Sequence, residues 1–419
     1  MEKVLLKNID RPDAHRIDAY MRYGGYRAVK KALARGRDEL IQLIKDSGLR
    51  GRGGAGFPAG LKWSFVPHDP TIQKYLCCNA DEGEPGTFKD RGIMDNDPHL
   101  LLEGMMIASY AIGASVAYIY IRGEFAFGAR RLQAAIDEAY DKGYLGKKIF
   151  GSDFSLDIFI HKGMGAYICG EETALLESIE GLRGQPRKKP PFPALAGLYG
   201  KPTVINNVET LSCIPAIVEK GVDWFKSMGP EKSPGPKLFC VSGHVKKPGL
   251  YELPMGTTIR DLVYNHCGGI RGDRKLKALI PGGVSAPMLT SEDLDTPLDF
   301  DSVAAKGSML GSGAVIVMDE NTCIPRVAYI TNRFFSHESC GKCTPCREGT
   351  HWLTEVLRRI EYGEGGTWDV ELMEKLCTNI FGRTFCPLGD GAVMALRGAF
   401  KNFREEFIYH ITHKRCMVS

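Results

Sequence analysis

Along the first half of the chain, apolar positions follow two different periods. Short runs rich in β-branched and aromatic residues, at 74–79, 116–121 and 156–161, predict buried strands. Between them, apolar residues recur every three or four positions, as over 128–142 and 171–179, which is typical of amphipathic helices. Strands that alternate with helices predict an α/β sandwich built around a largely parallel sheet.

One apolar segment raises the question of a membrane span. Residues 104–121 carry no charge and are just long enough to cross a bilayer. The pattern instead predicts a helix over 100–112, a break at Gly113 and a strand over 116–121. We therefore expect a buried helix–strand unit and no direct membrane span.

The second half of the chain divides at a proline-rich stretch, residues 228–236, which marks a linker. Beyond it, strand-like runs at 238–245, 250–253, 275–280 and 314–318 and a helical pattern at 258–266 predict a small β-grasp-like domain. From about residue 326 the pattern is helical to the end, apart from a cysteine loop and residues 361–366. We expect three domains, at 1–236, 237–325 and 326–419.

A cysteine triplet in the last domain carries the clearest chemical signal. Cys340, Cys343 and Cys346 are spaced as in bacterial ferredoxins, and the remote Cys386 precedes a proline as the fourth ferredoxin cysteine does. This spacing favours a [4Fe–4S] cluster. Zinc and uncoordinated thiols remain alternatives, although zinc usually takes paired ligands. Cys377 competes with Cys386 for the fourth position.

The residues around the triplet predict how it is held. Thr344 and Pro345 have the character of an N-cap and a first helical residue, so Cys346 is expected at a helix N-terminus. The cations Lys342 and Arg347 flank the thiolates and would offset part of a negative cluster.

Composition narrows the class of protein. The net charge of +4 in 419 residues is too small to argue for nucleic-acid binding. Thirteen cysteines without a disulfide-type framework, and an N-terminus without the apolar core of a signal peptide, indicate a reducing intracellular location.

A glycine-rich loop is the first candidate for a nucleotide or flavin site. Residues 51–56 fit Gly-x-Gly-x-x-Gly, but the preceding residues, 40–48, are helical, so the usual dinucleotide fold is not expected. The glycines still allow backbone N–H groups to approach a phosphate or a flat ring. Lys62 adds a cation, and Phe57 and Phe65 add flat apolar faces. A plain turn is the alternative.

Polar groups follow two of the predicted strands, where ligands of open α/β sheets lie. After the first strand come Asn79, Asp81, Glu82 and Glu84, whose alternative role is a solvated acidic turn. After the third comes a glycine turn with Tyr167, Glu171 and Glu172.

Helix capping is the alternative role for Glu171 and Glu172, because acidic groups are favoured at helix N-termini. Downstream, residues 183–192 combine three cations with Phe192, and the alternative there is an exposed basic loop.

At these segments the chain closely resembles the NADH-binding flavoprotein subunit of respiratory complex I, the NuoF-type subunit of NADH:quinone oxidoreductase. The matching runs, in family order, are 49–58 (Leu-Arg-Gly-Arg-Gly-Gly-Ala-Gly-Phe-Pro), 78–91, 165–175 (Gly-Ala-Tyr-Ile-Cys-Gly-Glu-Glu-Thr-Ala-Leu), 202–210 and 338–347 (Glu-Ser-Cys-Gly-Lys-Cys-Thr-Pro-Cys-Arg). The resemblance implies an FMN-binding α/β sandwich, a β-grasp domain of the soluble-ligand-binding (SLBB) type and a helical bundle that binds one [4Fe–4S] cluster.

The resemblance also implies site residues. FMN is expected to contact Gly51, Arg52, Gly53, Lys62, Asn79, Asp81, Tyr167, Glu171, Asn206 and Asn207. NADH is expected to contact Phe57, Phe65, Phe192, Glu84 and Glu172. Glu172 is the one side chain that we expect to tune the reaction. No side chain is expected to act as a general acid or base, because the hydride chemistry belongs to the cofactors.

The implied function is oxidation of NADH, with hydride passing to FMN and single electrons leaving through the cluster. The expected partners are a thioredoxin-like [2Fe–2S] subunit, a large multi-cluster iron–sulfur subunit and the remaining complex I subunits. The expected location is cytoplasmic, peripheral on the inner face of the cell membrane.

Two other functions stay open. One is the diaphorase subunit of an NAD-linked hydrogenase or formate dehydrogenase, whose homologues often carry extra cluster domains that this chain is not expected to have. The other is a non-enzymatic scaffold with structural zinc.

Overall fold

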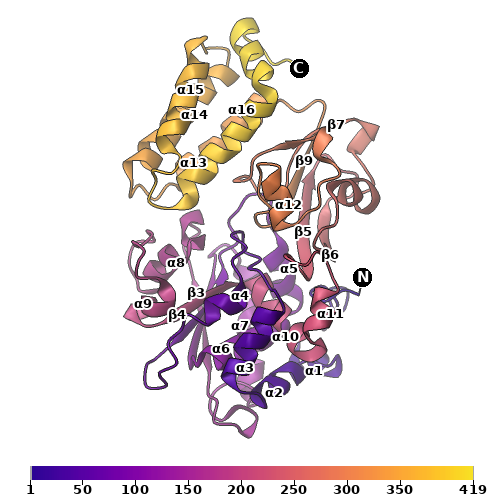
Figure 1. Cartoon of the computed structure of the whole chain (residues 1–419), viewed down its shortest axis with the longest axis vertical. Coiled ribbons are helices and arrows are strands. Elements are labelled where there is room, and N and C mark those ends of the chain that lie inside the picture. The colour runs from indigo at the N-terminus through magenta and orange to yellow at the C-terminus, as the bar shows by residue number, and fades with distance from the viewer. Residues whose placement is uncertain (1, 419) are drawn as a thin grey trace. The chain divides into compact units, whose positions relative to one another are not determined.

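The computed structural model describes residues 2–418 (Figure 1). The chain forms two compact units. The first comprises the residues up to Gly83 together with Phe88–Phe239 and Leu250–Gly256, and the second comprises Glu84–Thr87, Cys240–Gly249 and the residues from Thr257 onward. The three-domain division expected above stays a prediction.

The first unit is built on a four-stranded sheet in which every strand pair is parallel, as the sequence predicted. Its strands, in the spatial order β3-β2-β1-β4, are β1 (Tyr75–Ala80), β2 (Val116–Ile121), β3 (Asp157–Lys162) and β4 (Thr203–Asn207). The register pairs Asn79 with Asn207, so the carboxyl ends of β1 and β4 lie side by side. Polar residues that end these two strands therefore gather at one sheet edge.

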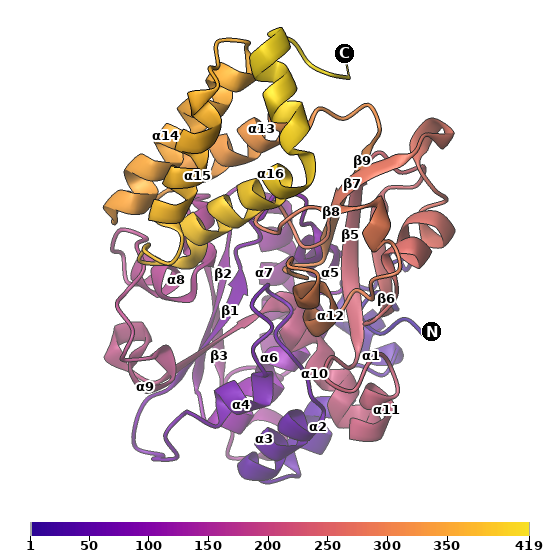
Figure 2. The ribbon, with the colours of Figure 1, turned by 45° about the horizontal axis from the view of Figure 1, so that its top comes forward.

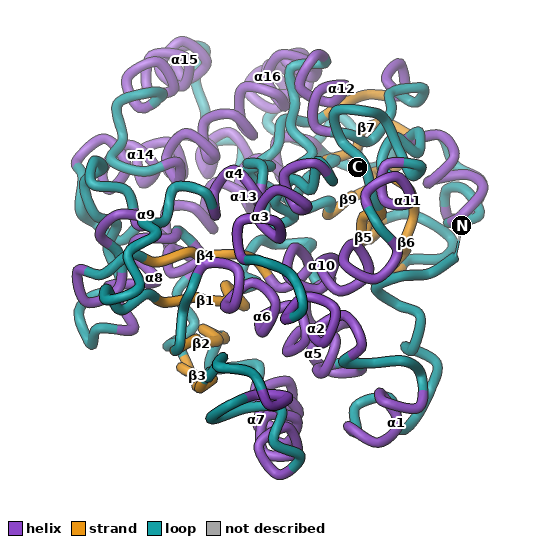
Figure 3. Tube along the Cα trace, turned by 60° about the horizontal axis from the view of Figure 1, so that its bottom comes forward, coloured by secondary structure: helices purple, strands orange, loops and turns teal. Residues whose placement is uncertain are grey.

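Eleven α-helices of the described chain belong to the first unit with this sheet (Figure 3). They are α1 (Ile17–Arg22), α2 (Arg27–Leu33), α3 (Arg37–Asp46), α4 (Ala59–Trp63), α5 (Lys89–Asn96), α6 (Pro98–Ile112), α7 (Ala126–Asp141), α8 (Glu172–Ile179), α9 (Pro193–Ala196), α10 (Val208–Lys220) and α11 (Val222–Lys226).

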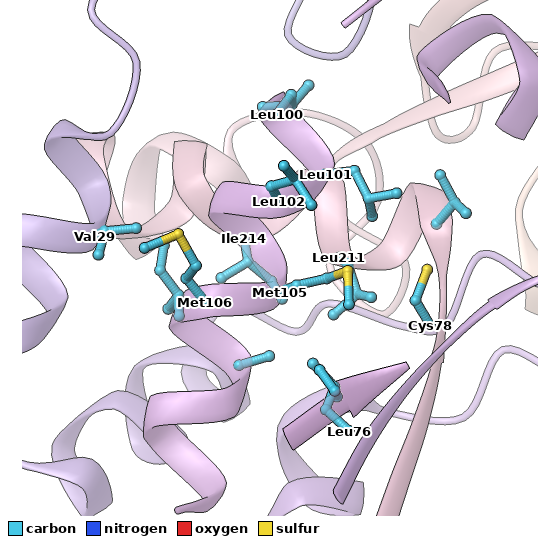
Figure 4. Packing of buried hydrophobic residues seen from close by; sticks show 14 of the residues in the cluster. Val29, Leu76, Cys78, Leu100, Leu101, Leu102, Met105, Met106, Leu211 and Ile214 are labelled. Atoms are coloured by element: carbon cyan, nitrogen blue, oxygen red, sulfur yellow. The ribbon is translucent and has the colours of Figure 1, made fainter. Parts of the chain in front are cut away.

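The uncharged segment forms the centre of the core of the first unit (Figure 4). Helix α6 is buried along nearly its whole length, and Gly113 ends it in a left-handed conformation before β2 begins. A Cβ at Gly104 would lie 2.0 Å from the Leu211 carbonyl oxygen, so α6 and α10 approach closely there. This confirms the predicted helix–strand unit. Within residues 2–418, no helix combines the length and apolar character that a bilayer span requires.

A second sheet has five strands in the order β6-β5-β9-β7-β8. They are β5 (Pro236–Gly243), β6 (Gly249–Pro254), β7 (Leu276–Ile280), β8 (Leu289–Thr290) and β9 (Ala314–Asp319), with the short helix α12 (Phe300–Ala305) preceding β9. The β5–β9 pair is parallel, whereas β7 pairs antiparallel with both β8 and β9. The helix predicted at 258–266 is present, and Asp261–His266 within it is π-helical.

Four long helices belong to the second unit (Figure 2). They are α13 (Ile324–Glu338), α14 (Thr344–Glu361), α15 (Trp368–Ile380) and α16 (Pro387–His413). Their apolar faces bury residues such as Leu353, Leu357, Met373, Val393 and Phe407 in one cluster. The predicted helical bundle is therefore present, and its cysteine loop lies between α13 and α14.

Candidate functional site

The glycine loop lies against the carboxyl end of β4. Its ends are held by backbone bonds from Gly51 N to the Phe57 carbonyl and from Ala59 N to the Leu49 carbonyl, each 2.9 Å long. A Cβ at Gly53 would come within 3.0 Å of the Asn207 Cβ, and Gly54 has a φ of +139°, which favours glycine. The loop thus brings backbone without side chains to the strand edge where α/β proteins bind ligands. This position fits a flat or phosphate-bearing cofactor.

A cluster of alternating charges lies at the same edge. The Lys62 ammonium on α4 donates to Glu172 Oε2 over 2.8 Å and to the Ile205 carbonyl of β4 over 2.9 Å. The Lys189 ammonium donates to Glu172 Oε1 over 2.7 Å and to Glu171 Oε1 over 3.2 Å. Two cations therefore contact the Glu172 carboxylate. Lys62 precedes it in the sequence and Lys189 follows it.

The two ammonium groups decide the charge of Glu172. Burial acts to raise the pKa of this carboxyl, but Coulombic attraction and hydrogen bonds from Lys62 and Lys189 outweigh it and take the pKa to about 2. The carboxylate is thus ionised at any physiological pH, and it supplies a fixed negative charge rather than a proton.

Two other predicted glutamates bond to helix N-termini. Glu171 is the N-cap of α8, and its Oε2 accepts from the backbone N–H groups of Thr173 and Ala174. Glu82 accepts from the N–H groups of Asp90 and Arg91 in the first turn of α5. Burial and the nearby Asp90 carboxylate raise the pKa of Glu82 to about 7. The capping alternative left open for Glu171 accounts for its position, and Glu82 has the same kind of role.

The turn after β1 is tightly packed. The Asn79 side chain donates to the Gly170 carbonyl and accepts from Asp81 N, which links this turn to the one before α8. A Cβ at Gly83 would lie 2.2 Å from Arg122 Nη1 and 3.3 Å from the Tyr167 ring. The predicted residues Asn79, Asp81 and Tyr167 are therefore brought together.

Sequence reasoning missed the arginine of this group. Arg122 Nη1 lies 3.6 Å from Asp81 Oδ1, directly beyond the end of β2. The same rule that pointed to the ends of the first and third strands would have found this residue.

Three more predicted residues are bound into the interior of the unit. Asn206 Oδ1 accepts from the Trp63 indole, and Asn207 caps α10 while donating to Asp90. Arg52 is fully buried, and its guanidinium donates to the Pro234 carbonyl. Its Nε and Nη1 atoms have no hydrogen-bond partner among the described residues.

The predicted aromatic residues are exposed, so their rings are open to a ligand. Phe57 and Phe65 are 47% and 50% exposed, with ring centroids 6.3 Å apart. Phe192, the residue before α9, is 56% exposed. Glu84 belongs to the second unit, where its Oε1 accepts from the N–H and hydroxyl of Ser285.

The cluster cysteines occupy two helix N-termini. Cys343 is the N-cap of α14 and Cys386 the N-cap of α16, and a proline stands in the first turn of each helix. Cys343 thus takes the capping position expected of Thr344, whereas Cys346 lies in the first turn of α14 as predicted. The positive ends of two helices favour thiolates and a negatively charged cluster.

Contacts among the thiols distinguish the two candidates for the fourth position. The N–H of Phe385, next to Cys386, donates to Cys343 Sγ over 3.4 Å. Burial raises the pKa of Cys346 to about 11, with the Cys343 and Cys340 sulfurs adding to the rise and Ser339 opposing it. Cys377 instead lines a cavity between α15 and α16 with Arg397 and Arg404. The donor set at the loop therefore fits an iron–sulfur cluster, with Cys386 placed beside the triplet.

Known families match each part of the chain. Residues 44–216 match the Nuo51 FMN-binding domain, residues 237–317 the SLBB domain, and residues 326–410 the NADH-ubiquinone oxidoreductase-F iron-sulfur binding region. The fold and the site thus define an oxidoreductase component that carries FMN and a [4Fe–4S] cluster, and both cofactor predictions are confirmed.

Whole-chain comparisons identify the family. The chain is 61% identical to the second NADH-quinone oxidoreductase F subunit of Rhizobium meliloti, over 99% of both chains. It is 53% identical to the corresponding F subunit of Streptomyces coelicolor, over 97% of this chain and 90% of that protein. It therefore belongs to the family of NADH-quinone oxidoreductase F subunits.

A solved structure has the same fold. A chain of an NAD+-reducing [NiFe]-hydrogenase in the H2-reduced state superimposes with a TM-score of 0.86 at 37% identity, over 98% of this chain and 67% of that one.

Proposed function

We infer that this chain is the NADH-oxidising subunit of a respiratory NADH:quinone oxidoreductase. The observation that carries the inference is that one chain combines the glycine loop beside Asn207 with four cysteines around two helix N-termini. When bound, FMN accepts two electrons from NADH and releases them singly, and a [4Fe–4S] cluster takes one at a time. The chain's own task is to hold and orient these groups.

FMN is proposed to bind along the edge formed by β1 and β4. Gly51 and Gly53 supply backbone that can approach the cofactor, and Lys62 supplies a cation. The remaining proposed contacts come from Arg52, Asn79, Asp81, Tyr167, Glu171, Asn206 and Asn207. Because Glu171, Asn207 and Arg52 already serve helix caps or interior bonds, we propose that they mainly fix the shape of the site.

Glu172 is proposed to act as a fixed charge next to the reacting groups. Its low pKa excludes proton donation near neutral pH. Lys62 and Lys189 hold both carboxylate oxygens, so the charge keeps one position during turnover. A fixed negative charge opposes tight retention of one redox form of the nucleotide.

NADH is proposed to stack on the exposed rings of Phe57, Phe65 and Phe192, because every base offers a face to an aromatic ring. Glu84 is proposed to bind ribose hydroxyls, and its carboxylate would repel the 2′-phosphate of NADPH. The Ser285 bonds hold this carboxylate in place within its own unit.

Cys340, Cys343, Cys346 and Cys386 are proposed as the four cluster ligands. Support for Cys386 over Cys377 comes from the Phe385–Cys343 contact and from the helix N-terminus that Cys386 caps. We propose that electrons leave through a thioredoxin-like [2Fe–2S] subunit and a large multi-cluster subunit of a complex on the cytoplasmic face of the membrane.

A second candidate function is the diaphorase subunit of an NAD-linked hydrogenase, which the similarity to the NAD+-reducing hydrogenase favours. Affinity purification of the tagged chain from its native host distinguishes the two. Co-purifying quinone-reductase subunits and NADH:quinone activity support the first function. Co-purifying hydrogenase subunits would replace it with the second.

A further inference from the structure

A second group of metal-ligand side chains lies in the second unit, made of residues other than the four proposed cluster cysteines. The ligand atoms of Cys323, His410 and Cys416 all lie within 4.8 Å of one another. Cys323 is the N-cap of α13, His410 lies in the last turn of α16, and Cys416 follows that helix. The group therefore joins the start of the helical bundle to the segment after its last helix.

The spacing within the group suits a single small ion. Cys323 Sγ lies 3.3 Å from His410 Nε2. Zinc bonds of about 2.3 Å to sulfur and about 2.0 Å to nitrogen, at a tetrahedral angle, separate these two ligand atoms by roughly 3.5 Å. The observed distance therefore needs little adjustment to accept an ion.

The imidazole is oriented as a metal ligand is. The His410 side chain is only 3% exposed, and its Nδ1 faces Glu361, whose Oε2 lies 4.0 Å away. The backbone of Ile360 and Glu361 also hydrogen-bonds to the ring. Metal-bound histidines hold their second nitrogen on a carbonyl or carboxylate in this way, which leaves the other nitrogen for the ion. Here that other nitrogen is Nε2, which faces Cys323.

Glu361 lies beside this group. Its Oε2 lies 4.0 Å from Cys323 Sγ as well as from His410 Nδ1. Its other oxygen, Oε1, lies 3.8 Å from Arg326 Nη1. Glu361 is therefore placed as the partner that orients the imidazole, and not as a metal ligand.

We propose that Cys323, His410 and Cys416 bind one zinc ion, with the Glu361 carboxylate beside the imidazole. Two thiolates and an imidazole select zinc over magnesium or calcium, which prefer oxygen. The ion links the segment after α16 to the last turn of that helix and to the N-cap of α13. Cys323 and Cys416 both lie outside the matched iron–sulfur region, which covers residues 326–410.

The test measures metals in the full chain, loaded with FMN and cluster and purified without oxygen. Elemental analysis is expected to find one zinc per chain in addition to the cluster iron. Cys416→Ser should lose the zinc but keep iron and FMN, whereas the neighbouring control Arg415→Ala should keep all three. Cys343→Ala should lose the iron and keep the zinc. That result would show that the zinc is not bound by the cluster cysteines.

A second measurement covers the case in which Cys416→Ser does not fold. Cobalt exchanged into the wild-type holoprotein should give the intense thiolate-to-cobalt absorption of a tetrahedral site. Absence of zinc from the native protein, absence of this absorption, or a Cys323–Cys416 disulfide in peptide mass spectra of the anaerobic protein would overturn the proposal.

Discussion

Lys62 and Glu172 are 110 residues apart in the chain, yet the lysine ammonium donates to the glutamate carboxylate over 2.8 Å. The two residues come from different helices, α4 and α8, and both side chains are about three-quarters buried. The sequence did not suggest this pair, because each residue was assigned separately to a different ligand. The pair ties the glycine-loop side of the proposed site to the glutamate-bearing turn.

Replacing the carboxylate should reduce stability in a pH-dependent way. Glu172→Gln should lower the free energy of unfolding by roughly 3 kcal/mol at pH 7, because the pKa falls from an ordinary 4.5 to about 2. A lowered pKa stabilises the fold above pH 4.5 and loses that effect as the pH falls toward 2. Chemical denaturation at pH 7 and at pH 3 measures the difference.

The matched control for that variant is Glu39→Gln, which breaks the exposed ion pair of Glu39 with Arg35. Exposed pairs contribute about 0–1 kcal/mol, so this variant should change little. A Glu172→Gln effect that is equally large at both pH values would mean that the charge of Glu172 is not its source.

A side chain at Gly53 should weaken flavin binding. In Gly53→Ala the new Cβ would meet the Asn207 Cβ at 3.0 Å, so the loop or the strand end must shift. Overpacking of this kind costs about 1–3 kcal/mol, which corresponds to a fivefold to hundredfold weaker affinity for FMN. Titration of the apoprotein with FMN, followed by fluorescence, measures the change.

Gly36→Ala serves as the control, since no atom lies within 4 Å of its added Cβ. Equal FMN affinity in the two variants would show that the loop at Gly53 does not shape the flavin site.

The exposed phenylalanines should contribute to nucleotide affinity. Stacking of a base on an aromatic ring contributes about 1–3 kcal/mol, so Phe57→Ala and Phe65→Ala should each raise KM for NADH about fivefold to a hundredfold with little change in kcat. Steady-state kinetics with a dye acceptor measure both constants. Phe127→Ala, which removes an equally exposed ring from α7, should leave KM unchanged. A rise in KM of the same size in that control would refute the assignment.

Removing one cluster ligand should separate two activities. Cys343→Ala should abolish the cluster and electron flow to quinone but spare NADH oxidation by small dye acceptors, because the flavin site does not include this residue. Cys386→Ala should behave in the same way, whereas Cys377→Ala should keep its iron. Iron analysis and the two assays on the assembled complex measure this. Loss of dye reduction in a folded, flavin-loaded Cys343 variant is the contrary result.

The sequence predicted most of the fold because the strong patterns are local. The strands β1, β2 and β3 and the helix α6 lie within a residue or two of their expected ranges. The strand β4 had no such pattern, since it is five residues long and ends in two asparagines. It forms because β1 offers it a partner, and pairing with a distant strand leaves no periodic trace in the sequence.

The roles of side chains were harder to predict than the positions of helices and strands. Glu82, Glu171 and Glu172 are all acidic residues in turns, yet two cap helices and one forms a double ion pair with lysines. The difference depends on which N–H groups and cations the fold brings near. The same limit hid the group of Cys323, His410 and Cys416, whose members come together only when α13 and α16 pack.

The central claim is that this chain takes electrons from NADH through a flavin and passes them to its own iron–sulfur cluster. Anaerobic addition of NADH to the purified, cofactor-loaded chain, followed by flavin absorbance and low-temperature EPR, tests it most directly. We predict that the flavin band bleaches and that the signal of a reduced [4Fe–4S] cluster appears in the same sample. Bleaching without that signal, in protein whose four cysteines hold iron, or finding zinc in place of iron at those cysteines, would contradict the account.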